Sequence, residues 1–129
     1  MIASLDHLVL TVADIEASIG FYSTVLGMER VSFAGGRTAL AFGQQKINLH
    51  LKGHEFEPKA KVPQPGSADL CFVAAVPLTA VQARLAAHAI AIEAGPVART
   101  GAVGPIMSVY VRDPDDNLIE ISSYALESD

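Results

Sequence analysis

The sequence predicts an α+β fold built from two copies of one strand–helix–strands unit. The first copy opens with residues 5–12, whose alternation turns His7 and Leu8 to opposite faces of a strand. A helix signal follows directly, with Asp14 as its N-cap. Residues 69–73 begin a second strand and helix in the same order. An internal repeat constrains the fold strongly, and we therefore predict two matching modules.

The remaining elements also follow one order in both copies. In the first copy the helix ends at Gly27, and a hairpin over residues 38–51 turns at residues 44–45. In the second copy the helix covers residues 78–88 and the hairpin covers residues 106–123. The apolar residues expected on the buried stripes are Ile15, Ile19, Tyr22 and Leu26 in the first helix and Leu78, Val81 and Leu85 in the second.

Two segments rich in proline or glycine interrupt this pattern. Residues 53–67 contain Pro58, Pro63 and Pro65, and we predict that they link a module over residues 4–57 to one over residues 66–125. Both modules belong to one domain of 129 residues. Residues 94–105 are rich in glycine and are predicted to form a long loop beside the second sheet. A lid and a plain solvent-exposed crossing are both consistent with this composition.

Composition excludes several classes of protein. Half of the residues are hydrophobic and 18% are charged, which excludes a disordered chain. The formal net charge of −5 and the pI near 5.2 argue against nucleic acid and an anionic membrane surface as partners. No apolar run is long enough to span a bilayer, and a single cysteine, Cys71, fits a reducing compartment. We expect a cytoplasmic protein.

Polar side chains occupy the inward positions of the predicted strands. His7 and Asp69 open the two copies, and Glu120 lies among apolar residues of the last strand. Burying an unpaired carboxylate costs on the order of several kcal/mol, and a divalent cation would offset that cost. Asn48 and His50 share a face on the last strand of the first copy. The matching positions in the two copies favour a metal site built from these strands.

Each of these residues also has a simpler interpretation. A single strand histidine is most often a hydrogen-bonded surface or core residue, and an aspartate just after Gly66 and Ser67 is usually part of a turn. Glu120 is also compatible with an exposed position on a sheet that has one wet face. Spacing alone leaves the metal site and these structural roles as open alternatives.

Several segments, taken together, are similar to one known family. They are Asp6-His7-Leu8, Asp14-Ile15-Glu16, Phe21-Tyr22-Ser23-Thr24-Val25-Leu26-Gly27-Met28 and Val109-Tyr110-Val111-Arg112-Asp113-Pro114-Asp115-Asp116-Asn117-Leu118-Ile119-Glu120. They resemble the vicinal oxygen chelate superfamily, which contains glyoxalase I, fosfomycin-resistance thiol transferases, extradiol dioxygenases and bleomycin-binding proteins. Within it the chain is similar to small glyoxalase-domain proteins, some of them described as virulence-associated.

The resemblance implies paired βαβββ modules that form a cup-shaped mixed sheet with the helices outside. It also implies a homodimer, often with modules exchanged between chains, and metal ligands at His7, Asp69 and Glu120. The chain departs from the family at Asp69, where histidine is usual, and at Asn48, where glyoxalase I has a glutamate. We expect His50 rather than Asn48 to complete the site or to orient the substrate, because imidazole binds the relevant metals better.

A ligand set of this kind favours Mn²⁺, Fe²⁺, Ni²⁺ or Co²⁺, and Zn²⁺ is also compatible with it. Such an ion would stabilise developing enolate or alkoxide charge, and Glu120 is the residue expected to move protons. Tyr110 is expected to hydrogen-bond the substrate, and Arg99 or Arg112 to bind an anionic group. For each arginine a plain surface charge is the alternative.

The leading functional hypothesis is a metal-dependent, glyoxalase I-like lyase or isomerase. Its substrate would be a small oxygenated molecule or a thiol adduct, such as the glutathione adduct of a 2-oxoaldehyde. The competing hypothesis is a non-catalytic drug-binding module of the bleomycin-resistance type. A thiol-transferase resistance enzyme of the fosfomycin type is a further alternative, disfavoured because Val9 stands where that type has a hydroxyl.

Overall fold

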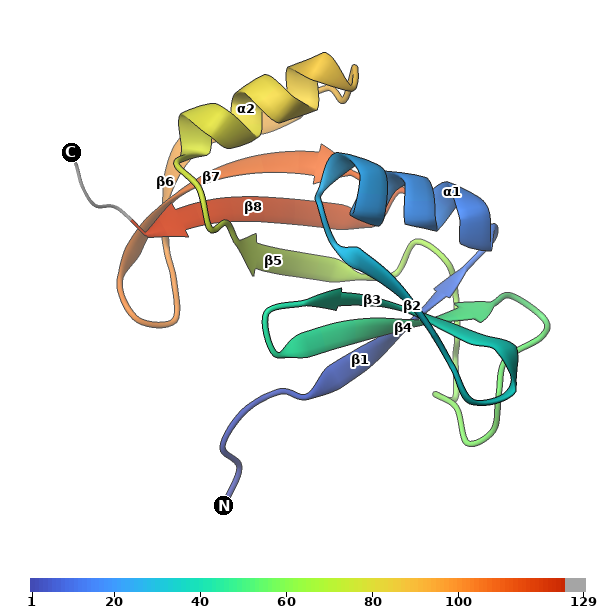
Figure 1. Ribbon diagram of the computed structural model, residues 1–129. Coiled ribbons are helices and arrows are strands. Elements are labelled where there is room, and N and C mark those ends of the chain that lie inside the picture. Colours follow the sequence, from blue (N-terminus) through green and yellow to red (C-terminus); the bar gives the residue numbers. More distant parts are fainter. Residues whose placement is uncertain (125–129) are drawn as a thin grey trace. The chain divides into compact units, whose positions relative to one another are not determined.

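The computed structural model describes residues 1–124, which divide into two compact units between Ala68 and Asp69. Residue 125, the last of the predicted second module, lies outside the described residues. Module 1 contains β1 (His7–Val12), α1 (Ile15–Ile19), the π-helical turn η1 (Gly20–Val25), β2 (Glu29–Phe33), the 3-10 turn η2 (Ala34–Gly36), β3 (Arg37–Phe42) and β4 (Gln45–Leu51). Module 2 contains β5 (Asp69–Val73), α2 (Leu78–Ala87), β6 (Ala94–Thr100), β7 (Pro105–Arg112) and β8 (Leu118–Tyr124) (Figure 1).

The two modules have the same sheet topology. Module 1 has the strand order β1-β4-β3-β2, and module 2 has the order β5-β8-β7-β6. In each sheet the first strand runs parallel to the last, and the other pairs are antiparallel. The predicted α+β fold of two matching copies is therefore confirmed, and each copy is a βαβββ unit.

The helix of module 1 starts as the sequence predicts but ends in a different geometry. The Asp14 side chain caps α1 by accepting a hydrogen bond from the Ala17 amide at 3.0 Å. The last turn is π-helical, with the Leu26 amide donating to the Phe21 carbonyl at 3.0 Å. The wider turn changes which side chains face the sheet. Phe21 and Val25 are buried, whereas Leu26, expected on the buried stripe, is only half-buried.

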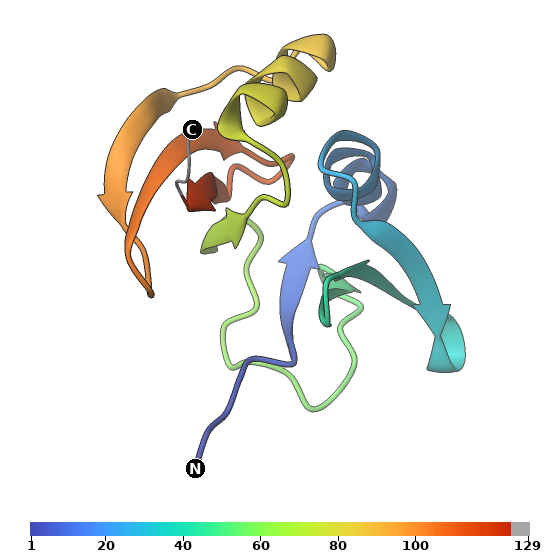
Figure 2. The same ribbon diagram turned by 60° about the vertical axis from the view of Figure 1, so that its left-hand side comes forward.

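The core of each module lies between its helix and one face of its sheet. Module 1 buries Tyr22 completely, together with strand residues Leu10, Val12, Leu40, Ile47 and Leu49. Module 2 buries Val81 and Leu85 of α2 with strand residues Val109, Val111, Ile119 and Ile121. In both views α2, drawn in yellow, lies along the sheet of its own module (Figure 1, Figure 2). We call the opposite face of each sheet its helix-free face.

The segment predicted to be a long loop in module 2 is mostly a strand. Residues 94–100 form β6 and pair with β7, so the prediction of a loop or lid over residues 94–105 is wrong. Strand β6 accommodates a Gly-Pro pair because β6 lies at the edge of its sheet and has a bulge at this point. The N–H group that proline lacks is not needed there for a hydrogen bond between strands. Only residues 101–104 form the turn. In module 1 the hairpin turns at residues 43–44, one residue earlier than predicted.

The segment between the modules contains neither helix nor strand from residue 52 to residue 68, as its prolines predict. Neither α1 nor α2, nor any other helix within residues 1–124, is long and apolar enough to cross a membrane.

Candidate functional site

The predicted ligands occupy equivalent positions of the two modules. In module 1, Val9 pairs with Asn48, and His7 lies two residues before Val9. In module 2, Cys71 pairs with Glu120, and Asp69 lies two residues before Cys71. Each pair therefore lies diagonally across two parallel strands, about 8 Å apart between Cα atoms. Both pairs lie on the helix-free faces. Within residues 1–124, no three His, Cys, Asp or Glu side chains form a group that could hold an ion.

His7 presents one ring nitrogen to its surroundings. Its Nδ1 lies 2.8 Å from the Asp6 carboxylate, and the side chain is 43% exposed. A carboxylate on one imidazole nitrogen fixes the tautomer and leaves the other nitrogen as an acceptor. His7 Nε2 is thus the atom suited to bind a metal ion.

Asn48 carries a buried acceptor that has no partner. Its Oδ1 is enclosed and receives no hydrogen bond from any residue between 1 and 124. Leaving a buried acceptor unsatisfied costs about 1–3 kcal/mol. Such an atom is suited to accept a hydrogen bond from a ligand or to bind a cation. Its position in module 1 is the one that Glu120 takes in module 2.

His50 lies further along the same face and is only 7% exposed. Its ring packs edge-on against Phe56, with ring centroids 5.5 Å apart. Burial lowers the pKa of His50 from its ordinary value of 6.5, the nearby Arg37 guanidinium lowers it further, and Glu55 partly opposes both effects. His50 is therefore a neutral imidazole at pH 7.

One oxygen of Glu120 is held by two buried serines. The Ser108 hydroxyl donates to Glu120 Oε2 at 2.6 Å and lies 2.6 Å from the Ser122 hydroxyl, which also faces Oε2 at 3.4 Å. Both serines are fully buried. Because Ser108 donates its single proton to the carboxylate, only Ser122 can donate in the contact between the two hydroxyls, and it shares its proton between Ser108 and Oε2. Both serine hydroxyls contact Oε2, so Oε1 is the oxygen that they leave open to a ligand, and Cys71 is the other side chain that hydrogen-bonds this carboxylate.

The thiol of Cys71 ends this hydrogen-bond chain, 3.2 Å from the Ser122 hydroxyl. Cys71 is exposed as a residue, but partial desolvation of its thiol raises the pKa, the hydrogen bond with Ser122 lowers it, and the negative charge of Glu120 raises it again. The thiol therefore stays protonated at neutral pH, and its hydrogen bond to the Glu120 carboxylate also raises its pKa. Its role is to complete the network behind Glu120 rather than to act as a nucleophile.

Tyr110 lies directly across from Glu120 in the pairing of β7 with β8. The Arg99 Nε donates to the Tyr110 hydroxyl at 3.0 Å, and its Nη1 donates to the Ala98 carbonyl at 3.0 Å. Because Tyr110 accepts in this contact, its own phenolic proton remains available for a ligand. A hydrogen-bond donor and a carboxylate thus stand side by side on the helix-free face of module 2.

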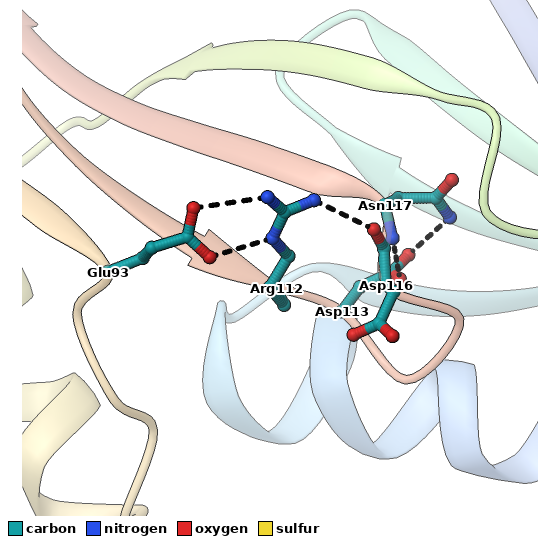
Figure 3. Close-up of polar contacts among 5 residues, drawn as sticks. All are labelled: Glu93, Arg112, Asp113, Asp116 and Asn117. Atoms are coloured by element: carbon teal, nitrogen blue, oxygen red, sulfur yellow. Dashed lines mark hydrogen bonds and ion pairs between the residues drawn. The ribbon is translucent and has the colours of Figure 1, made fainter.

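The last of the predicted site residues, Arg112, is held by protein groups (Figure 3). Its Nε and Nη2 contact the Glu93 carboxylate at 2.9 and 3.1 Å, and its Nη1 donates to the Asp116 carbonyl at 3.1 Å. This arrangement lowers the pKa of Glu93. The neighbouring turn is closed by Asp113, which accepts hydrogen bonds from the Asn117 amide at 2.9 Å and from its side chain at 2.8 Å. The acidic motif is therefore a structural turn that sets where β8 begins.

The sequence pattern does not predict the serine pair or the residues that surround His50. Ser108 and Ser122 face each other on neighbouring strands, but serine is common on strands and the pattern alone gives it no special meaning. Phe56 lies in the proline-rich segment and reaches His50 only through tertiary structure. Arg37 is the first residue of β3 and lies one residue before the predicted hairpin over residues 38–51.

A family model described as the Glyoxalase/Bleomycin resistance protein/Dioxygenase superfamily matches residues 4–121. Glyoxalase domain-containing protein RDO1 from Mycosarcoma maydis is 63% identical over 123 residues, which cover 95% of this chain and 69% of that protein. Virulence protein STM3117 from Salmonella typhimurium is 57% identical over 124 residues, which cover 96% of this chain and 86% of that protein. The crystal structure of STM3117 has a TM-score of 0.95 and covers 97% of this chain and 99% of that one.

More distant structures share the fold alone. A lactoylglutathione lyase from Agrobacterium tumefaciens is 24% identical with a TM-score of 0.72, and covers 95% of either chain. The antibiotic-binding protein TnmS3 from Streptomyces is 21% identical with a TM-score of 0.74, and covers 96% of this chain and 98% of that one. One fold thus carries both an enzyme and a binding protein, so function must be argued from the site.

Proposed function

Because the chain belongs to the glyoxalase/bleomycin resistance protein/dioxygenase superfamily, we propose that it is a metal-dependent enzyme of the glyoxalase I-like lyase or isomerase type. The ligands in this proposal are His7, Asp69 and Glu120, completed by the neutral oxygen of Asn48. The observation that carries it is the unpartnered, buried Oδ1 of Asn48 at the position equivalent to Glu120. Asn48 replaces His50 as the expected fourth ligand, because the His50 ring packs against Phe56.

The donor atoms fit a divalent ion of the first transition series. One imidazole nitrogen, two carboxylates and an amide oxygen suit Mn²⁺, Fe²⁺, Co²⁺, Ni²⁺ or Zn²⁺. Such an ion, when bound, stabilises negative charge on neighbouring oxygens of a small oxygenated substrate. The substrate class is a small carbonyl compound or its thiol adduct, such as a glutathione adduct.

The residues of module 2 have distinct roles in the proposed reaction. Glu120 moves a proton between adjacent carbons, and the serine pair keeps its Oε2 fixed so that Oε1 faces the ligand. Tyr110 donates its phenolic proton to a substrate oxygen, with Arg99 holding the phenol in place. Arg99 is also the arginine better placed to meet an anionic group, because Glu93 already binds Arg112.

The test combines metal analysis with turnover. We expect protein purified without added ions to carry about one transition-metal ion per site, and Glu120→Gln to lose both the metal and the turnover of methylglyoxal plus glutathione. Glu16→Gln is the matched control, because Glu16 is an exposed carboxylate whose partner is Arg30. Wild-type protein that binds no divalent ion at all would overturn the proposal.

A binding module without catalysis is the second candidate. One observation favours it: Asn48 stands where glyoxalase I carries a glutamate, and an amide cannot act as a base. The same experiment separates the two functions. Metal binding that depends on Glu120 without turnover of any oxoaldehyde, together with tight binding of a small drug-like molecule, would favour the binding module.

A further inference from the structure

We propose that Asp6 and Gln45 are positioning residues that present the Nε2 atom of His7 to a metal ion. Because His7 is the first ligand of the proposed metal site, this role rests on the proposed function. Asp6 holds the imidazole in the tautomer that leaves Nε2 without a proton, and Gln45 holds the chain that carries Asp6. Neither residue binds the ion itself.

Asp6 lies just before the sheet, where the pairing of strands does not hold the backbone. Strand β1 begins at His7, which pairs with Lys46, so Leu5 and Asp6 precede the first pair of residues. The Asp6 carboxylate lies 2.8 Å from His7 Nδ1, and the Asp6 side chain is 87% exposed. Water therefore competes for this carboxylate, and the contact with His7 is favoured only if the backbone of Asp6 is kept in place.

Gln45 supplies that restraint from the neighbouring strand. Its side-chain Nε2 donates to the Leu5 carbonyl at 2.9 Å. Gln45 is the first residue of β4 and comes directly before Lys46, the partner of His7. The Leu5 carbonyl belongs to the planar peptide group that leads into Asp6, so this bond restrains the backbone that carries the carboxylate. The carboxylate is thereby tied to the same pair of strands that carries His7.

The two modules show that the fold itself does not need this carboxylate. Asp69 opens β5 as His7 opens β1, and the residue before Asp69 is Ala68, in place of Asp6. Module 2 nevertheless has the same strand order and the same parallel pairing of its first and last strands. A βαβββ unit therefore forms without an acidic residue at this position.

The difference between the modules follows the chemistry of the two ligands. The oxygens of the Asp69 carboxylate are equivalent, and either can bind an ion without any choice of proton position. The His7 imidazole has two distinct nitrogens, and its Nε2 can bind an ion only when the proton of the neutral ring is on Nδ1. A carboxylate that accepts from Nδ1–H fixes that tautomer and makes Nε2 a stronger ligand. The acidic neighbour thus stands beside the histidine, where it has a use, and alanine stands beside the aspartate.

The first measurement determines the tautomer of His7 in the metal-free protein, by long-range ¹H–¹⁵N NMR at about pH 9, where histidine rings are neutral. We expect the proton on Nδ1 in the wild type. Asp6→Ala should move it towards Nε2, and Asp6→Asn, whose side-chain carbonyl also accepts, should restore the Nδ1–H form. Gln45→Met has a similar length but no donor, and should move the proton part of the way. The ring signals of His54 and His88 are the internal reference, and the same spectra show whether each variant is folded.

The second measurement is the affinity for Zn²⁺ alone, by competition with a chromophoric chelator. Asp6→Ala should weaken Zn²⁺ binding by about 10–100-fold, and Asp6→Asn should weaken it less. Glu16→Ala is the matched control, because it removes one exposed carboxylate from the same module, and it should leave both the tautomer and the affinity unchanged.

An Nε2–H tautomer of His7 in the wild type would overturn the inference. So would a folded Asp6→Ala protein with the wild-type tautomer or the wild-type affinity for Zn²⁺. Since no metal is present in the first measurement, its outcome is independent of whether Glu120 binds an ion, and the two proposals can fail separately.

Discussion

Ser108 is the residue whose replacement best separates the support of Glu120 from its chemistry. Ser108→Ala removes the 2.6 Å hydrogen bond to Oε2 and leaves the buried Ser122 hydroxyl without its neighbour. We expect a loss of about 1–3 kcal/mol in the free energy of unfolding, measured by urea denaturation, since buried polar groups are left unsatisfied. Metal affinity should fall with it, because Oε1 is no longer held in place.

Ser123→Ala is the control for this change. Ser123 is the next residue of β8 and points to the opposite face, so its hydroxyl cannot reach Glu120. It should leave metal affinity unchanged. A Ser108→Ala protein with wild-type stability and metal affinity would show that the serine pair does not hold the carboxylate.

His50 gives a pH dependence whose sign follows from its environment. The folded protein holds the pKa of His50 below 6.5, so the unfolded chain binds a proton at this residue more readily. The stability that a neutral His50 allows is therefore present above pH 6.5 and is lost as the pH falls from there towards the folded pKa. We expect the free energy of unfolding to drop between pH 7.5 and pH 5.5 more steeply in the wild type than in His50→Gln. Parallel curves would contradict this assignment.

At the scale of elements, two glycines near the end of the first helix make opposite predictions. Gly27 has a φ of 82°, in the left-handed region, whereas Gly20 has a helical φ of −55° and ψ of −44°. A Cβ at either position would contact nothing within 4 Å, so only the backbone conformation decides the outcome. Gly27→Ala should destabilise the protein by roughly 1–2 kcal/mol. Gly20→Ala should stabilise it by roughly 0.5–1 kcal/mol.

The measurement is the midpoint of chemical denaturation for both variants, prepared side by side with the wild type. The two midpoints should move in opposite directions. A shift in the same direction would mean that the π-helical turn, rather than local backbone preference, dominates the response.

Elements with a clear period could be predicted from the sequence, and elements at sheet edges could not. The strand at His7, the cap at Asp14 and the extent of α2 all follow from alternation, capping and helical spacing. Strand β6 was mistaken for a loop, because its glycines and proline give a turn signal that only its edge position overrides. The residues of the π-helical turn, 20–25, also fit an ordinary α-helix, so the sequence alone does not predict the wider turn.

The site was predictable to the same degree. The alternation of side chains along a strand places His7 and Asn48 on one face of the first sheet. It places Asp69 and Glu120 on the equivalent face of the second sheet. The partners that tune these residues could not, since Ser108 meets Glu120 only through the pairing of two strands.

At the scale of the whole molecule, the proposed site needs two residues from each module. The pairs belong either to one chain or to two copies of it in a homodimer. Mixing His7→Ala with Glu120→Gln under refolding conditions distinguishes these cases. If sites form across chains, a mixed dimer contains one site with both residues intact, and metal binding should return to about a quarter of the wild-type level for random pairing. If sites form within one chain, both variants should remain empty after mixing.

The parallel pairing of first and last strands has a consequence for how the chain is made. Strand β1 finds its neighbour β4 only after the helix and two other strands have been synthesised, and β5 waits for β8 in the same way. Because the ribosome synthesises the chain from its amino terminus, β1 leaves the exit tunnel before the strand with which it pairs has been made. Its apolar residues Leu8 and Leu10 then stay accessible to chaperones until Leu51 has emerged. The sheet of each module can therefore be completed only after the last strand of that module has been synthesised.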